Sequence, residues 1–191
     1  MKIEGETVQR YIEGQRFLFL AEQCLNLTKK SLDPILRRHD LNHSQYLILM
    51  ILNCADATGQ QVISTELSYL LGREKHTITP LVESLVRSGC LERGRDPDDR
   101  RVIALTLTRK GKNLIRKVQP LTIPTVSDIP LGSKEEKNSL FRILEGFRRS
   151  FAQKSGQDPD LYSGAFNRLL VEGESKLLEG ASAAARDGRR K

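Results

Sequence analysis

The chain has 191 residues and a formal net charge of +7. This length supports one domain with an extension, and the basic excess favours a polyanionic partner such as nucleic acid. No apolar run approaches the roughly 18 residues of a membrane helix, and the N-terminal residues lack the apolar stretch of a signal peptide, so we expect a cytoplasmic protein with no membrane partner.

The cysteines and histidines indicate no catalytic or metal centre. Cys24, Cys54 and Cys90 are widely spaced and form no C-x-x-C pair. This spacing favours neither a zinc site nor a disulfide framework. The histidines are scattered, and the sequence contains no Ser/His/Asp arrangement, phosphate loop or metal cluster. We therefore expect no enzyme activity, no cofactor and no metal site.

The first predicted element is a long helix over residues 15–38. Its apolar residues recur at spacings of three and four, and further apolar residues lie beside that stripe. An apolar surface of this width predicts contacts both with the chain's own core and with a partner. A second helix is predicted over 41–54 with Ser44 as its N-cap, and a polar loop follows at 56–61.

Two short helices and a pair of strands follow. Ser64 is predicted to cap the first of these helices, and Ser64 and Thr108 are candidate helix-cap or phosphate-binding residues. The second helix, over 75–88, has a buried apolar stripe. Alternating residues then predict two strands joined by a charged turn at 93–101.

The C-terminal third is predicted to be helical with interruptions. Thr108 caps a helix that is expected to stop before Pro120. Residues 120–132 contain three prolines and a glycine and are interpreted as a linker. Ser133 begins an S-x-x-E capping box and a further amphipathic helix. The extension at 155–191 is expected to hold one more helix and a disordered basic tail.

The helix over 75–88 has the properties of a helix that enters the major groove of DNA. Such a helix needs an apolar face that packs against the rest of the protein and positions the helix. Near its N-terminus it exposes Lys75, His76 and Thr79, which can reach base edges or phosphates. Pro80 is unusual inside a helix because it removes the hydrogen bond to the carbonyl of His76.

The charged turn is predicted to be a second DNA-binding element. An arginine on a loop can enter the minor groove, where the potential is most negative, and a neighbouring acid can orient it. A solvated loop whose charges satisfy one another is the alternative. The arginines of this turn are Arg93, Arg95, Arg100 and Arg101, and its acids are Asp96, Asp98 and Asp99.

Two motifs in this part of the chain carry a family resemblance. The first motif reads D-P-D-D-R-R at 96–101 and continues with L-T-R-K-G at 107–111. The second motif begins with T-I-T at 77–79 and continues with L-V at 81–82, L at 85 and G-C-L-E-R at 89–93. The block resembles the winged helix-turn-helix of the MarR family of bacterial and archaeal transcriptional regulators. The resemblance covers roughly residues 15–151. It implies a mainly α fold with a small β-hairpin wing and with dimerisation helices at both ends.

The resemblance also implies partners and residue roles. A homodimer would bind a palindromic double-stranded DNA operator, with a small-molecule effector or another signal modulating binding. Arg101 would be the minor-groove arginine of the wing, and Asp99 the acid that orients it. The groove-facing positions would be Glu74, Lys75, His76, Thr77, Thr79 and Pro80. Glu74 replaces the small N-capping residue usual in the family; it is compatible with capping but not with close approach to phosphate.

The expected function is that of a dimeric regulator, usually a repressor in this family. The expected domains are the N-terminal dimerisation helix 1–40, the winged unit 41–119, the linker and second dimerisation helix 120–154, and the extension 155–191. One alternative is a thiol-based redox regulator that uses Cys24, which would otherwise be a small core residue. The other is a winged helix that serves only protein contacts.

Overall fold

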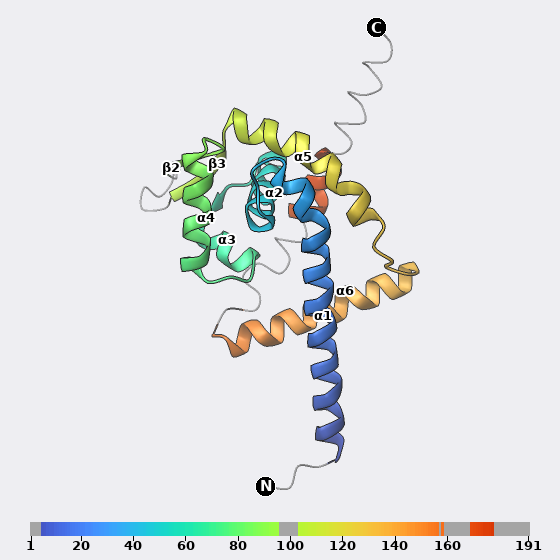
Figure 1. Cartoon of the computed structure of the whole chain (residues 1–191). Helices are drawn as coiled ribbons and strands as arrows, with labels where there is room; N and C mark the ends of the chain where they lie inside the picture. The colour runs from blue at the N-terminus through green and yellow to red at the C-terminus, as the bar shows by residue number, and fades with distance from the viewer. Residues whose placement is uncertain (1–4, 96–102, 157, 159–168, 178–191) are drawn as a thin grey trace.

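The computed structural model describes residues 5–95, 103–156, 158 and 169–177. Helix α1 (Gly5–Arg37) is the longest element and projects from the body of the molecule toward the N-terminus (Figure 1). It begins ahead of residue 15, where the sequence predicted its start, because apolar residues at spacings of three and four continue through its first turns. Pro34 lies inside α1 without ending it. Only Leu32 and Leu36 of α1 are buried.

Helix α2 (His43–Thr58) forms the centre of the core. Its N-cap is Asn42, whose side-chain oxygen accepts from the N–H of Gln45 at 2.9 Å, while the Gln45 side chain accepts from the N–H of Asn42 at 3.0 Å. The prediction of Ser44 as the cap was therefore wrong, because the Asn–Gln pair satisfies two free N–H groups reciprocally. The helix continues to Thr58, so the predicted loop at 56–61 is shorter than expected.

Three short strands form one antiparallel sheet in the order β1-β3-β2. Strand β2 (Leu91–Arg95) pairs with β3 (Ile103–Leu107), as the sequence predicted. On its other side, β3 pairs with β1 (Val62–Ile63), which the sequence analysis missed. Two residues are too few to show an alternating pattern, so only the partner strand reveals β1.

Helices α3 (Ser64–Leu70) and α4 (Lys75–Arg87) pack against each other and against this sheet, and α4 also packs against α2. Ser64 does not cap α3: it is the first helical residue, and the side chain of Glu66 accepts from the N–H of Ile63 at 2.8 Å. The buried stripe predicted for α4 is confirmed. Its most buried members are Ile78, Val82 and Leu85, each 1% exposed.

The start of α5 (Arg109–Ser127) is fixed to the base of the β2–β3 hairpin. Thr108 caps the helix as predicted: its hydroxyl oxygen accepts from the N–H of Gly111 at 3.1 Å. The same hydroxyl donates to the carbonyl of Gly89 at 2.6 Å. A Cβ added to Gly111 would lie 2.1 Å from the carbonyl oxygen of Cys90. Only glycine therefore lets the helix approach the strand so closely.

Helix α5 runs through Pro120 and Pro124, so the predicted end before Pro120 and the linker over 120–132 were both wrong. Each proline removes one hydrogen bond from the helix ladder. Packing compensates, because Val118 and Thr122 are buried where α5 packs against α1 and α2. Tertiary contact thus overrides the local tendency of proline to end a helix.

Helix α6 (Lys134–Lys154) begins at the predicted capping box: Ser133 and Glu136 each accept from the other's N–H. It crosses α1 in Figure 1, and the rings of Phe17 and Phe147 lie 5.0 Å apart at this crossing. No residue of α6 is buried within the chain.

Residues 169–177 are helical and lie against the core, with Leu169 4% exposed. This confirms the C-terminal part of the helix predicted in the extension; its remainder and the predicted tail lie outside the described residues. No described helix combines the length and apolarity needed to cross a membrane.

Candidate nucleic-acid interface

The N-terminal half of α4 presents the side chains that the sequence assigned to DNA. Lys75, His76, Thr77, Thr79 and Pro80 are all exposed, while the apolar face of α4 is turned into the core. The buried face fixes the rotation of the helix about its axis. The polar face of its first turns is therefore free to meet a ligand.

Glu74 occupies the N-cap position of α4, but its side chain makes no capping hydrogen bond. The expectation that this acid could cap the helix is therefore not met. A glutamate has one methylene more than the aspartate that suits this position, and aspartate, not glutamate, is among the preferred caps. The exposed carboxylate instead adds a negative charge beside the helix start.

The backbone carbonyls of Lys75 and His76, near the start of α4, differ in their hydrogen-bond donors. The hydroxyl of Thr79 donates to the carbonyl of Lys75 at 2.9 Å, which leaves the Thr79 oxygen available as an acceptor. Pro80 lies inside α4 without breaking it. Since proline has no N–H, the carbonyl of His76 lacks its helical donor.

A groove of about 340 Å³ runs between α3, α4 and the sheet. It brings together four of the predicted site residues, Ser64, Lys75, Thr79 and Arg93, from three different elements. Two cations and three hydroxyl groups line it, together with one acid. The full lining is Ile63, Ser64, Thr65, Lys75, Ile78, Thr79, Glu83, Arg93 and Ile103.

The acid in this groove, Glu83, was missed by the sequence analysis. Its carboxylate lies 4.0 Å from the guanidinium of Arg93. Both side chains are well exposed, so the pair contributes little to stability. Helical spacing could have indicated Glu83, because it follows Lys75 and Thr79 at successive steps of four residues on the same face.

The wing is described at its base only. Strand β2 holds the backbone of Gly94 and Arg95 against β3, with Gly94 opposite Ala104. The predicted tip residues, including Asp99, Arg100 and Arg101, lie outside the described part of the chain. Their assigned roles stay predictions.

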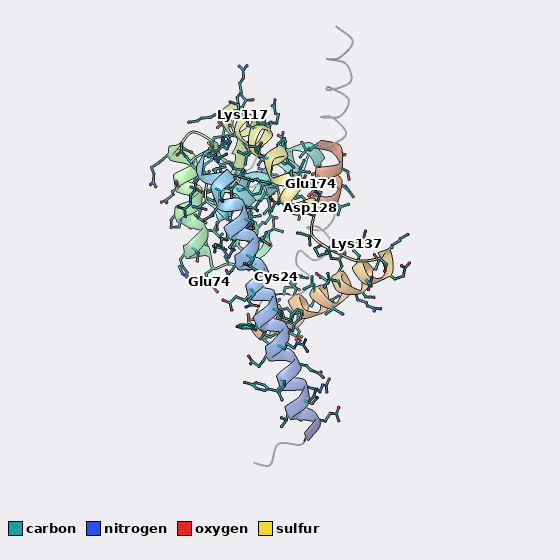
Figure 2. The ribbon with its side chains drawn as sticks, turned by 45° about the vertical axis from the view of Figure 1, so that its right-hand side comes forward. Cys24, Glu74, Lys117, Asp128, Lys137 and Glu174 are labelled. Atoms are coloured by element: carbon teal, nitrogen blue, oxygen red, sulfur yellow. The ribbon has the colours of Figure 1, made fainter. Side chains whose placement is uncertain are left out.

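The three cysteines have different surroundings. Cys24 is exposed on α1, as Figure 2 shows, so it is not a core residue of this chain. Cys90 is buried and belongs to the hydrophobic core. Cys54 is also buried, and loss of solvent raises the pKa of its thiol to about 12. Within the described residues, no group of three or more His, Cys, Asp or Glu side chains could hold a metal ion.

Comparison with solved structures supports the same architecture. The chain is similar to a mutant MarR from E. coli complexed with operator DNA, with a TM-score of 0.58 and 21% identity, covering 72% of this chain and 95% of that one. It is also similar to CouR from Rhodococcus jostii RHA1 bound to p-coumaroyl-CoA, with a TM-score of 0.59 and 20% identity, covering 69% and 90%. These likenesses establish a winged-helix fold.

Sequence comparison gives a family match for part of the chain. The transcriptional regulator TtmR of Methylorubrum extorquens is 30% identical over 124 residues, which are 64% of this chain and 60% of that relative. The chain thus spans less than two thirds of the length of that relative. Residues 41–103, from just before α2 to the first residue of β3, match the model of the MarR family. The winged-helix unit of this chain therefore carries a MarR family match and is similar to transcriptional regulators of that family.

Proposed function

We propose that this protein regulates transcription by binding DNA through the N-terminal half of α4. The observation that carries the proposal is the groove beside α4. It places Lys75 and Arg93 together with three hydroxyl groups next to a helix whose opposite face is buried. Cations and hydroxyls are the groups that bind phosphate oxygens, and an exposed helix start can reach base edges in the major groove.

Within this proposal, the residues divide into two roles. Lys75 and Arg93 bind the phosphodiester backbone, and His76 and Thr79 meet base edges or phosphates. Arg101, oriented by Asp99, enters the minor groove from the wing. The similar fold of the mutant E. coli MarR in complex with operator DNA supports this use of the fold.

We infer that the active form is a homodimer. Large apolar side chains are exposed along α1, the second half of α5 and α6. Monomeric proteins rarely expose continuous apolar patches above a few hundred Å², so a second copy is the natural cover. Two α4 helices in such a dimer would meet successive major-groove faces roughly 34 Å apart. The exposed residues include Phe19, Leu20, Leu25, Leu27, Val126, Phe141, Ile143 and Phe151.

We further propose that the regulator represses its targets and that an effector or signal modulates its affinity at the junction between the dimerisation helices and the winged unit. Helices α2 and α5 form this junction, because α5 packs against α1 and α2 packs against α4. An effector that binds one arrangement of the junction better shifts the population toward it. The similar fold of CouR with bound p-coumaroyl-CoA supports an effector-responsive regulator.

Selection of a duplex from a random DNA library, followed by titration at several salt concentrations, tests the proposal. We expect the protein to select a palindromic sequence. Lys75→Ala should then weaken binding about tenfold and reduce the salt slope by about one ion. Lys134→Ala, an exposed lysine at the start of α6, is the matched control and should change neither.

Two results would contradict the proposal. A protein that selects no sequence would favour a winged helix used for protein contacts. Equal loss in Lys75→Ala and Lys134→Ala would show that net charge, not the α4 surface, governs binding. Arg101→Ala tests the wing separately: unchanged affinity and salt slope would remove the wing from the interface.

A further inference from the structure

The helical segment 169–177 makes an unusually close contact with α2. Gly173 is buried, and a Cβ added to it would lie 2.5 Å from the Cβ of Cys54 and 2.7 Å from its Cα. Two helices approach this closely only where one of them lacks a side chain. The segment is therefore shaped to fit α2, and any larger residue at Gly173 must push it away.

Glu174 connects the same segment to both core helices. One of its carboxylate oxygens accepts from the side-chain amide of Gln119 on α5, and the other lies 3.9 Å from the sulfur of Cys54 on α2. Figure 2 shows Glu174 on this segment, beside α5. Burial raises the pKa of Glu174 and that of the Cys54 thiol. A half-buried acid with polar partners on two helices fixes the position of the segment specifically.

The position of this contact matters because α2 and α5 join the two parts of the molecule. Helix α5 packs against α1, while α2 packs against α4 and β3. A segment attached to both α2 and α5 therefore restricts how α4 moves relative to α1. Its docking is coupled to the placement of the recognition surface.

We propose that residues 169–177 form a regulatory strap that docks across the α2–α5 junction and holds α4 ready to bind DNA. This inference depends on the proposed DNA binding. Release of the strap loosens the junction, and the winged unit must then be ordered when DNA binds, which lowers affinity. An effector or partner that takes the surface around Cys54 and Gln119 has to displace the strap.

The Cys54 thiol provides a direct readout of docking in the full-length protein. Labelling with N-ethylmaleimide, with Cys54 followed by mass spectrometry, should show Cys54 protected. In Gly173→Ala, the added methyl group should displace the strap and raise the Cys54 labelling rate at least tenfold. Alanine favours a helix more than glycine does, so local helix propensity predicts the opposite result.

Gly146→Ala is the matched control, because a Cβ at Gly146 meets nothing within 4 Å and the glycine also lies inside a helix. Cys54 should stay protected in this variant. A second test variant with its own control makes the conclusion independent of the Gly173 substitution. Glu174→Lys places a cation in the half-buried site and should release the strap. Glu172→Lys changes the net charge equally at an exposed position and should not.

Binding to the duplex selected by the wild-type protein gives the functional readout. Both releasing variants should bind this duplex about three- to tenfold more weakly than their controls. Unchanged Cys54 protection in Gly173→Ala and Glu174→Lys overturns docking, and released Cys54 with unchanged or tighter DNA binding overturns the regulatory role. If the wild-type protein selects no duplex, the proposed function and the strap's effect on DNA fail together, while the labelling rates still decide whether the strap docks.

Discussion

The hydroxyl groups of Tyr46 on α2 and Thr122 on α5 lie 2.9 Å apart in the buried interface between the two helices. Thr122 uses its single proton to donate to the carbonyl of Gln119 at 2.8 Å. Tyr46 must therefore be the donor in the Tyr46–Thr122 hydrogen bond. This bond ties the two junction helices together beside the strap.

Because Tyr46 is the donor, substitutions of Tyr46 and of Thr122 should lower the free energy of unfolding by different amounts. Tyr46→Phe leaves the Thr122 proton paired and should lower the free energy of unfolding by about 1 kcal/mol. Thr122→Val leaves the buried Tyr46 hydroxyl without its acceptor and should cost up to about 3 kcal/mol. Urea unfolding measures both. The exposed Tyr11→Phe is the control, and a larger loss in Tyr46→Phe would contradict the assigned donor.

Glu174 makes the free energy of unfolding depend on pH, and its contribution decreases as pH rises. Burial raises its folded-state pKa above the ordinary value of 4.5, so the folded protein binds more protons than the unfolded chain over the interval between the two values. The contribution of this site to stability therefore falls as pH rises through that interval. Glu174→Gln should remove this component, and Glu172→Gln should retain it.

Urea unfolding at pH 5 and pH 7 measures this effect as a difference between variants. The comparison is needed because Glu136 and Glu145 have lowered pKa values from hydrogen bonds to Ser133 and Arg148, and their contributions are lost as pH falls. Equal pH dependence in the two glutamine variants would show that Glu174 is not desolvated.

Among the described glycines, Gly111 is the least able to accept a side chain. Because a Cβ there would overlap the Cys90 carbonyl oxygen, Gly111→Ala must separate α5 from the hairpin. We expect a loss of about 2–3 kcal/mol in the free energy of unfolding, typical of forced overpacking. Gly146→Ala, which has open space, should be neutral or slightly stabilising. Similar melting temperatures for the two variants would contradict the close contact.

Glu83 opposes phosphate binding in the proposed interface. Glu83→Gln keeps the size of the side chain, removes the negative charge beside Arg93 and should tighten binding to the selected duplex by up to about fivefold, the range of an exposed charge pair. The salt dependence should become steeper. Glu145→Gln, on α6, is the control for net charge. Weaker binding in Glu83→Gln would show instead that Glu83 orients Arg93.

The proposed dimer can be tested on α6. Phe141 is 53% exposed and lies on its apolar face. Phe141→Asp should convert the dimer into monomers in sedimentation velocity, because a buried, unpaired carboxylate is costly in an apolar interface. Asn138→Asp adds the same charge at an exposed polar position. A wild-type protein that sediments as a monomer at micromolar concentration would exclude the dimer.

Patterns that depend on neighbouring residues could be predicted from the sequence. The buried stripe of α4 follows from helical spacing. The Thr108 cap and Gly111 belong to the L-T-R-K-G motif at 107–111, and the close contact with Cys90 is the physical reason for its glycine. Four of the residues that line the α4 groove were identified in the same way. Glu83 could not be identified from the first turns of α4 alone, because it lies about two turns after Lys75 and contacts Arg93 on β2 in the groove.

Features that depend on distant contacts could not be predicted. Proline ends most helices, yet α5 continues because Val118 and Thr122 are buried and the helix packs against α1 and α2. Strand β1 exists only through its pairing with β3. The fit between Gly173 and Cys54 joins positions far apart in the sequence, and no local pattern signals it.

Helix α6 has 21 residues and buries none of them within its own chain. In proteins, most of the stability of a helix comes from packing of its apolar face rather than from its intrinsic propensity. Under the proposed assembly, folding of α6 and pairing of two chains are therefore one event, governed by mass action. Promoter occupancy would then rise more steeply than in proportion to the number of chains in the cell, which gives the regulator a threshold set by its own abundance.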